Sequence, residues 1–134
     1  MGKMAKWFWT LAVLALSSRA FVWEDLAFLK ELVAIPSVSS DIAKCNEVVE
    51  FVNGKIVEEG LFSSIVTNGE GRAVLYASTM DTKVPDVLVS VHLDVVPPSV
   101  EGQFVAREKD GFLYGRGMSD CKGSLRGQSP NKVW

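Results

Sequence analysis

Two stretches in the first half of the chain carry apolar residues at helical spacing, and each predicts a helix. In residues 23–34 the apolar positions recur every three or four residues, acidic residues open the stretch and Pro36 closes it. In residues 41–59 Asp41 is a suitable N-cap and Gly60 a suitable terminator. The apolar stripe of this second helix is predicted to consist of Cys45, Val48, Val49, Val52, Ile56 and Val57.

The pattern then changes to that of strands. Residues 61–67 and 72–78 flank a turn sequence rich in Gly and Asn, which predicts a hairpin. Residues 104–108 and 112–114, joined by an Asp-Gly turn, predict a second hairpin. This order of helices and strands is typical of an α/β fold with a mixed sheet flanked by helices.

Residues 87–93 lie between the two hairpins and are almost continuously apolar. Such a run is typical of a central strand that is buried on both faces of a sheet. We therefore expect His92 and Asp94 to lie at the C-terminal end of a central strand, where α/β sheets collect their ligands.

The two ends of the chain differ in pattern from the middle. Residues 1–20 combine two lysines, a short apolar run and Ser18-Arg19-Ala20, which together predict a secretory signal peptide. An uncleaved anchor or an amphipathic helix is the alternative, so the product is expected to be secreted or periplasmic, or else membrane-associated through its N-terminus. Residues 124–134 show no apolar periodicity and contain two helix breakers. This tail is expected to be foreign to the fold that precedes it.

Composition excludes several function classes. The 134 residues suffice for one domain with a modest core. The net charge of −2 leaves no excess of basic residues for phosphate contacts, so no nucleic-acid partner is expected. The two cysteines, Cys45 and Cys121, match no zinc-finger spacing and indicate no disulfide framework.

The chemistry is concentrated in two short motifs. Residues 92–94 read His-Leu-Asp, and residues 115–123 read Gly-Arg-Gly-Met-Ser-Asp-Cys-Lys-Gly, with His92 the single histidine of the sequence. Imidazole and carboxylate are metal ligands, so His92 and Asp120 are candidates for that role. Side chains at i and i+2 of an extended strand leave the same face, which lets Asp94 approach the imidazole and fix its tautomer.

Simpler readings of these motifs stay open. A lone histidine at a strand end is commonly a packed or surface residue. The Gly115-x-Gly117 sequence fits a turn that needs positive φ, and Asp120 fits a helix N-cap. Lys122 fits either a source of positive potential at the site or a solvated side chain.

Taken together in this order, the two motifs resemble the M20 metallopeptidase family, which contains N-acyl amino acid deacylases, carboxypeptidases and dipeptidases. The resemblance runs from about Trp23 to Gly123. It implies that His92 binds one of two zinc ions and that Asp120 bridges both. It also implies that Asp94 is the catalytic-site residue behind His92, and that the peptide bond after Asp120 is often cis.

The resemblance also implies parts that this sequence does not contain. Members of the family have a Glu-Glu pair with the general base, a further carboxylate ligand, a second histidine and a dimerising lid domain. Residues 21–123 are therefore expected to form the N-terminal portion of a zinc-peptidase-like catalytic domain, truncated at its C-terminal side. A homo-oligomer is expected only through the lid.

Two functions are considered, the first from this resemblance and the second from the leader-like pattern of residues 1–20, and a third, plainer interpretation is an unstable product that is degraded on synthesis. In the first, the complete form is a zinc-dependent hydrolase of an amide bond in N-acyl amino acids or small peptides, and this chain alone is inactive. In the second, the chain is a secreted, non-catalytic product that binds metal weakly or associates with a full-length relative through unpaired sheet edges.

Overall fold

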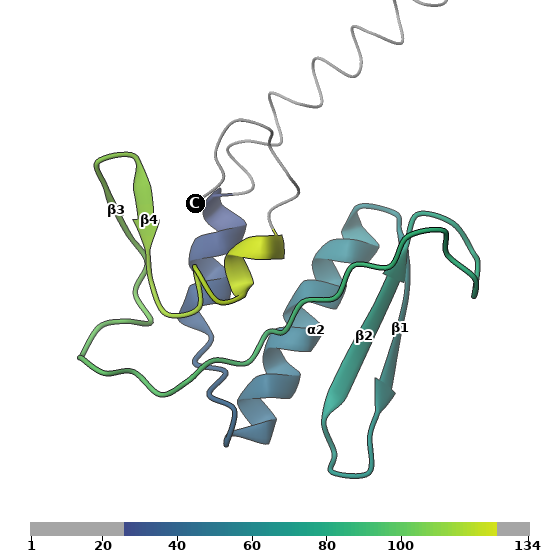
Figure 1. Cartoon of the computed structure of the whole chain (residues 1–134), viewed down its shortest axis with the longest axis horizontal. Helices are drawn as coiled ribbons and strands as arrows, with labels where there is room; N and C mark the ends of the chain where they lie inside the picture. The colour runs from purple at the N-terminus through teal and green to yellow at the C-terminus, as the bar shows by residue number, and fades with distance from the viewer. Residues whose placement is uncertain (1–25, 126–134) are drawn as a thin grey trace, which may run out of the picture.

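The computed structural model describes residues 26–125. Two helices form its centre, with one strand hairpin against the second helix and another hairpin at the far side (Figure 1). The predicted leader at residues 1–20, the start of the first helix and most of the predicted tail lie outside the described residues. Within those residues, neither helix has the length and apolar run needed to cross a bilayer.

The first helix occupies residues 26–34, in agreement with the predicted stretch where that stretch is described. Helix α2 spans Ile42–Glu58, and the Asp41 side chain caps it by accepting a hydrogen bond from the Lys44 amide. Gly60 has a φ of 73°, which suits the residue that ends a helix. Both predicted helices are therefore confirmed, with their predicted cap and terminator.

The hydrophobic core lies between these two helices. Its buried members are Leu29 and Leu32 from the first helix and Val48 and Val52 from α2. The rings of Phe28 and Phe51 stack beside it, with centroids 5.5 Å apart. The predicted apolar stripe of α2 is correct except at Val57, which is 57% exposed although the adjoining Ile56 packs against the core, because successive helix residues point about 100° apart.

The first hairpin consists of β1 (Phe62–Thr67) and β2 (Ala73–Ser78), paired antiparallel. It packs on α2, and the Asn46 side chain ties the helix to the turn by hydrogen bonds to Gly71 and Ala73. The second hairpin consists of β3 (Arg107–Lys109) and β4 (Phe112–Tyr114). It turns through Asp110 and Gly111, which both have positive φ. Both hairpins are confirmed, although β3 begins at Arg107 and not at residue 104 as predicted, and the fold class is α/β.

The predicted central strand at residues 87–93 is wrong. This segment is extended, as the trace crossing in front of α2 shows in Figure 1, but it pairs with no strand among residues 26–125. Its first residues, Val87, Leu88 and Val89, are each more than three-quarters exposed. A strand needs neighbours for its backbone hydrogen bonds, and the described chain supplies only a single parallel bridge, Val38 to Val95.

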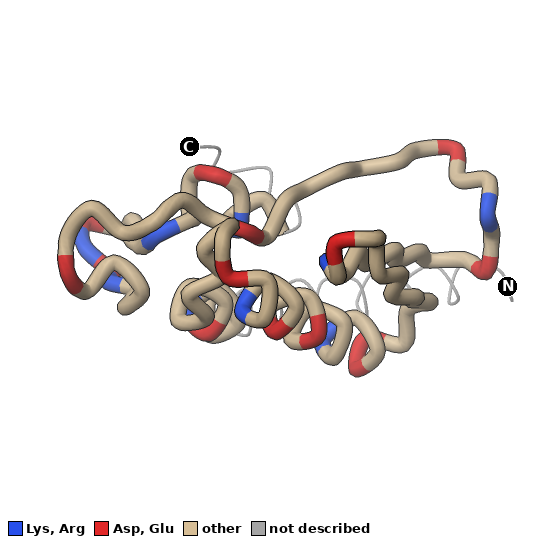
Figure 2. Tube along the Cα trace, turned by 90° about the horizontal axis from the view of Figure 1, so that it is seen from below, with Lys and Arg blue, Asp and Glu red and all other residues tan. Residues whose placement is uncertain are grey.

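Charged residues of both signs are interspersed along α2 and the connecting segments, as the blue and red positions of the tube show in Figure 2. Lysine and glutamate one helical turn apart pair on its exposed face, as Lys44 with Glu47 and Lys55 with Glu58. Exposed pairs of this kind contribute little to stability, about 0.3–0.5 kcal/mol each. The fold therefore rests on the apolar contact between the helices.

Candidate metal site

The segment that carries His92 is held in place at its C-terminal end, residues 93–95. The Val95 amide donates to the Ser37 carbonyl at 2.9 Å, and the Ser39 amide donates to the Val95 carbonyl at 3.0 Å. The buried Ser37 hydroxyl donates to the Leu93 carbonyl at 2.7 Å. These three bonds hold residues 93–95 against the connection between the two helices. His92 and Asp94 therefore have a defined position although no sheet surrounds them.

The loop carrying Asp120 follows β4 and depends on its glycines. Gly117 has a φ of 85°, and a Cβ there would lie 2.7 Å from a methyl group of Val95. A Cβ at Gly115 would lie 2.7 Å from a methyl group of Val33 on the first helix. The turn interpretation of this motif is thus correct for Gly117, and both glycines let the loop approach the core closely.

Lys122 anchors the same loop to the first helix. Its side chain is fully buried, and its ammonium donates to the carbonyls of Leu32 and Ile35, each at 2.8 Å. These carbonyls belong to the C-terminal end of a helix, where acceptors lack partners within the helix and a positive charge is favourable. Burial lowers the pKa of Lys122 to about 8. The interpretation of Lys122 as a solvated lysine is wrong.

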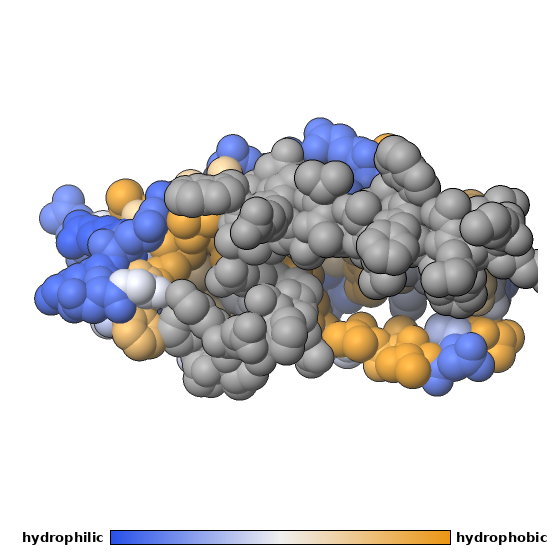
Figure 3. Space-filling model, turned by 90° about the horizontal axis from the view of Figure 1, so that it is seen from above, coloured by the Kyte–Doolittle hydropathy of each residue, from blue (hydrophilic) through white to orange (hydrophobic). Residues whose placement is uncertain are grey.

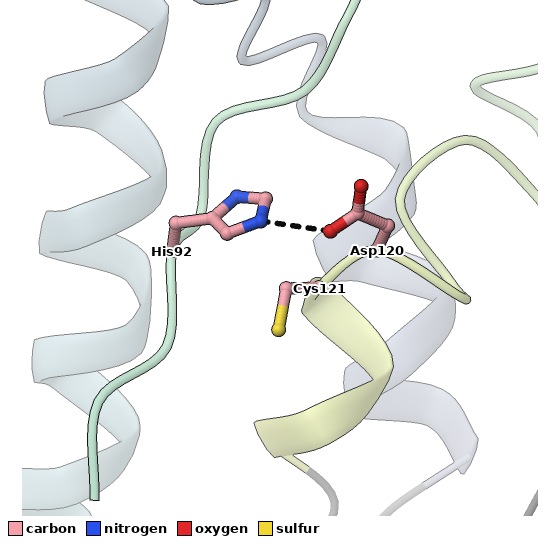
Figure 4. Close-up of side chains that lie close together, drawn as sticks. All are labelled: His92, Asp120 and Cys121. Atoms are coloured by element: carbon pink, nitrogen blue, oxygen red, sulfur yellow. Dashed lines mark hydrogen bonds and ion pairs between the residues drawn. The ribbon is translucent and has the colours of Figure 1, made fainter.

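His92 and Asp120 meet although 28 residues separate them in the sequence. Nε2 of His92 lies 2.9 Å from Oδ1 of Asp120, as the dashed line in Figure 4 shows. On the other side of the ring, Nδ1 lies 3.0 Å from the backbone carbonyl of Asp94 and 3.4 Å from its carboxylate. The structure thus brings together all three site residues named from the sequence.

The contacts of His92 favour its protonated form. Both ring nitrogens face oxygen acceptors, which only the imidazolium can satisfy by donating from both. The hydrogen bond to Asp120, followed by that to the Asp94 carbonyl, accordingly raises the pKa of His92. A metal ion at Nε2 would replace one proton while Nδ1 continued to donate to Asp94. This is the tautomer that ligation through Nε2 requires.

Asp94 is oriented by Ser39, whose hydroxyl donates to Oδ2 of Asp94 at 2.7 Å. This hydrogen bond is the main cause that lowers the pKa of Asp94. Arg72 holds Ser39 in turn, because its guanidinium donates to the Ser39 carbonyl at 2.7 Å. Neither Ser39 nor Arg72 could be predicted from the sequence, because Asp94 lies 55 residues from Ser39 and Ser39 lies 33 residues from Arg72.

The donor set at the site suits a divalent transition metal. One ligand atom each from His92, Asp120 and Cys121 lie within 4.8 Å of one another, and nitrogen, oxygen and sulfur are all donors that zinc accepts. The side chains of His92 and Asp120 are 51% and 86% exposed, so both are open to an ion from solvent. The peptide bond between Asp120 and Cys121 is cis.

Comparison with known proteins gives a consistent answer. Residues 88–128, which include both motifs, match the sequence model of peptidase family M20/M25/M40. The chain is 33% identical over 105 residues to the succinyl-diaminopimelate desuccinylase of Bordetella avium, and 38% identical over 111 residues to that of Nitrobacter hamburgensis. It is also 33% identical over 110 residues to a probable carboxypeptidase of Emericella nidulans.

These matches cover most of this chain and a small part of each relative. They include 75%, 76% and 77% of this chain for the Bordetella, Nitrobacter and Emericella proteins. They include 26%, 28% and 25% of those proteins, in the same order. The chain therefore spans about a quarter of the length of the curated relatives it matches.

Proposed function

We propose that this chain is a segment of a member of peptidase family M20/M25/M40, and that its longer form is a metal-dependent hydrolase of an amide bond in N-acyl amino acids or small peptides. The observation that carries the proposal is the contact of His92 with Asp120, with Asp94 behind the imidazole. The names of the relatives, a desuccinylase and a carboxypeptidase, support this substrate class.

The site residues have different roles in this proposal. His92 would hold one zinc ion through Nε2, and Asp120 would bring a carboxylate to the same ion and to a second one. Asp94 would keep the imidazole oriented through its carbonyl, and Ser39 would keep Asp94 in place. Zinc, when bound, lowers the pKa of a water molecule and polarises the carbonyl that the water attacks.

The 134-residue chain is proposed to be inactive by itself. Its one histidine and the carboxylate of Asp120 do not suffice to hold two zinc ions beside a general base. We expect the pure chain to bind zinc in a calorimetric titration and to release no product from a panel of N-acyl amino acids. Chelator-sensitive hydrolysis by this chain would overturn the proposed inactivity.

The metal site itself is tested by two substitutions and a control. His92→Ala and Asp120→Ala should each weaken zinc binding at least tenfold, since each removes a ligand. Asp86→Ala removes an exposed carboxylate outside the site and should leave binding unchanged. Equal affinity in all four proteins would show that zinc binds elsewhere.

A second candidate function is association with a longer relative, and a groove supports it. Beside α2 lies a groove of about 620 Å³, lined on one side by β2 and on the other by Val89, Val91 and Leu93. The side chains of Val87, Leu88 and Val89 are largely exposed. Apolar surface is seen in orange at the lower right of Figure 3. β2 pairs with a strand, β1, at one edge only, and residues 87–92 pair with no strand among residues 26–125, so a strand from another chain could pair with either.

Size-exclusion chromatography with light scattering tests this second function. The 134-residue chain should co-elute with a longer relative, and Val89→Asp should abolish the complex because Val89 lines the groove. Val84→Asp is the matched control, since Val84 is 85% exposed and lies outside the groove. A wild-type chain that elutes alone, as a monomer, would remove this candidate.

Export of the product is proposed from residues 1–20, whose pattern is that of a leader peptide. The intact mass of the natural product in cells and in culture medium tests it. A secreted species lacking the leader supports export, and a product found only inside cells with the leader attached contradicts it.

A further inference from the structure

Cys121 stands beside the metal-site residues and has no part in the function proposed above. Figure 4 shows its side chain below the hydrogen bond between His92 and Asp120, with the sulfur directed toward the 3-10 helix (Lys122–Leu125). The Cys121 sulfur, a nitrogen of His92 and a carboxylate oxygen of Asp120 are mutually within 4.8 Å. Three different donor types thus converge from two segments of the chain.

The spacing of these atoms matches a single bound ion. Any three points no more than 4.8 Å apart lie within about 2.8 Å of a common centre, by elementary geometry. Zinc bonds are about 2.0–2.1 Å to imidazole nitrogen, about 2.0–2.2 Å to carboxylate oxygen and about 2.3 Å to thiolate sulfur. Side-chain shifts of less than about 1 Å would therefore bring all three atoms to bonding distance.

The surroundings of Cys121 allow such a shift. Its sulfur donates a hydrogen bond to the hydroxyl of Ser124 at 3.2 Å, a neutral contact near the surface that a metal bond can replace. The other thiol, Cys45, provides an internal contrast. It is a buried residue of α2, its sulfur faces the carbonyls of Ser37 and Val38, and it lies outside the cluster.

We propose that the Cys121 thiolate is the third protein ligand of one thiophilic divalent cation, held together with His92 and Asp120 and open to water at its fourth position. The thiol proton passes to solvent when the ion binds. Sulfur in the ligand set favours zinc or cobalt over magnesium or calcium, which prefer oxygen. The proposal rests on His92 and Asp120 being metal ligands, as proposed above, and adds a site that holds one ion in this chain alone.

Cobalt titration of the 134-residue chain tests the proposal, because thiolate bound to Co²⁺ gives a near-ultraviolet charge-transfer band that oxygen and nitrogen ligands do not give. We expect this band to saturate at one cobalt per chain. Cys121→Ser should abolish it and weaken binding at least tenfold, whereas Cys45→Ser should leave the band and the affinity unchanged. A band that persists in Cys121→Ser, or disappears in Cys45→Ser, overturns the proposal.

The same titration separates this inference from the function on which it rests. Cobalt that binds through His92 but gives no thiolate band would contradict the role of Cys121 and leave the metal site standing. Absence of cobalt binding would overturn the role of Cys121 and the expectation that this chain binds a metal ion by itself, whereas activity of the longer form is tested separately by its hydrolysis of N-acyl amino acids.

A measurement on the unsubstituted chain tests the same proposal without depending on the folding of a variant. Zinc should slow alkylation of Cys121 at least tenfold, as read by peptide mass spectrometry, and chelation should reverse the effect. Equal alkylation of Cys121 with and without saturating zinc would also overturn the proposal.

Discussion

The contact between the first helix and α2 differs sharply from the extended segment at residues 84–91, although both are rich in valine and leucine. Leu32 and Val48 are fully buried in the helix contact, whereas Val84 and Val87 are 85% and 77% exposed. The composition of the two regions does not explain this difference. The two regions differ in whether residues 26–125 contain another segment that packs against them.

The difference follows from where backbone hydrogen bonds are made. A helix satisfies its own backbone groups and needs only one apolar face covered, which the neighbouring helix provides. A strand must find both its hydrogen-bond partners and its apolar cover in other segments. Residues 84–91 have neither among residues 26–125, so their apolar side chains face solvent and the groove.

The largest expected effect comes from removing side-chain volume in the buried region. Leu32→Ala should lower the free energy of unfolding by about 2–5 kcal/mol, because it removes a buried side chain and leaves a cavity. Val84→Ala should change it by less than about 0.5 kcal/mol, since Val84 is exposed. Urea denaturation followed by circular dichroism measures both. Similar losses for the two variants would contradict the assignment of the core.

Lys122→Met should give the next largest effect. The substitution leaves the carbonyls of Leu32 and Ile35 without their donor, which costs about 1–3 kcal/mol for buried groups. Lys83→Met is the matched control on the exposed segment and should be nearly neutral. Urea denaturation again provides the measurement. An unchanged midpoint for Lys122→Met would mean that Lys122 does not anchor the loop.

How far the sequence predicted the fold depends on the range of the contacts involved. The helix at α2, its Asp41 cap and both hairpin turns were predictable, because spacing and turn residues within a few positions define them. The strand predicted at residues 87–93 failed because its pairing depends on segments elsewhere. An apolar run indicates that burial is favourable without showing that a partner is present.

The candidate site likewise contains residues that the sequence could predict and residues whose roles depend on distant segments. His92, Asp94 and Asp120 could be named from their motifs, and the structure places them together. The buried role of Lys122 could not be predicted, because its acceptors lie 90 and 87 residues earlier in the chain. For Asp94, the sequence predicted that it lies behind the imidazole. It did not predict that the closest acceptor is the backbone carbonyl, because that depends on how Ser39 holds the carboxylate.

The two thiols should differ in reactivity by at least tenfold, equivalent to about 1.4 kcal/mol. Burial is the main cause that raises the pKa of Cys45, with the negative charge of Asp94 next, so its thiolate forms only at higher pH than that of a free thiol. Cys121 is only partly buried and should react first. Alkylation of the metal-free chain at pH 8 and pH 10, read by peptide mass, measures the difference. Faster reaction of Cys45 at pH 8 would place it in an exposed position.

The sign of the same shift predicts how stability depends on pH. Because the pKa of Cys45 is raised on folding, the unfolded chain loses its thiol proton first as the pH rises through the ordinary value of 9.0. Above that pH the native chain still holds a proton that the unfolded chain has lost. The free energy of unfolding therefore falls as the pH rises further. Cys45→Ala should weaken this alkaline loss, while Cys121→Ala should leave it in place. An alkaline loss of equal size in both variants would contradict the assignment to Cys45.

The smallest expected effect tests whether Ser39 orients Asp94. Ser39→Ala removes the hydroxyl that donates to Asp94, and a hydrogen bond of this kind contributes about 0.5–1.5 kcal/mol to stability. The pKa of Asp94, followed by NMR, should rise in the variant because the bond to Ser39 is the main cause that lowers it. Ser99→Ala, which changes an exposed serine whose hydroxyl bonds to Gln103 and Arg116, is the control. If the pKa of Asp94 stays the same in both variants, the carboxylate is held by the imidazole of His92 and the backbone alone, and Ser39 has no part in setting the geometry behind the metal ligand.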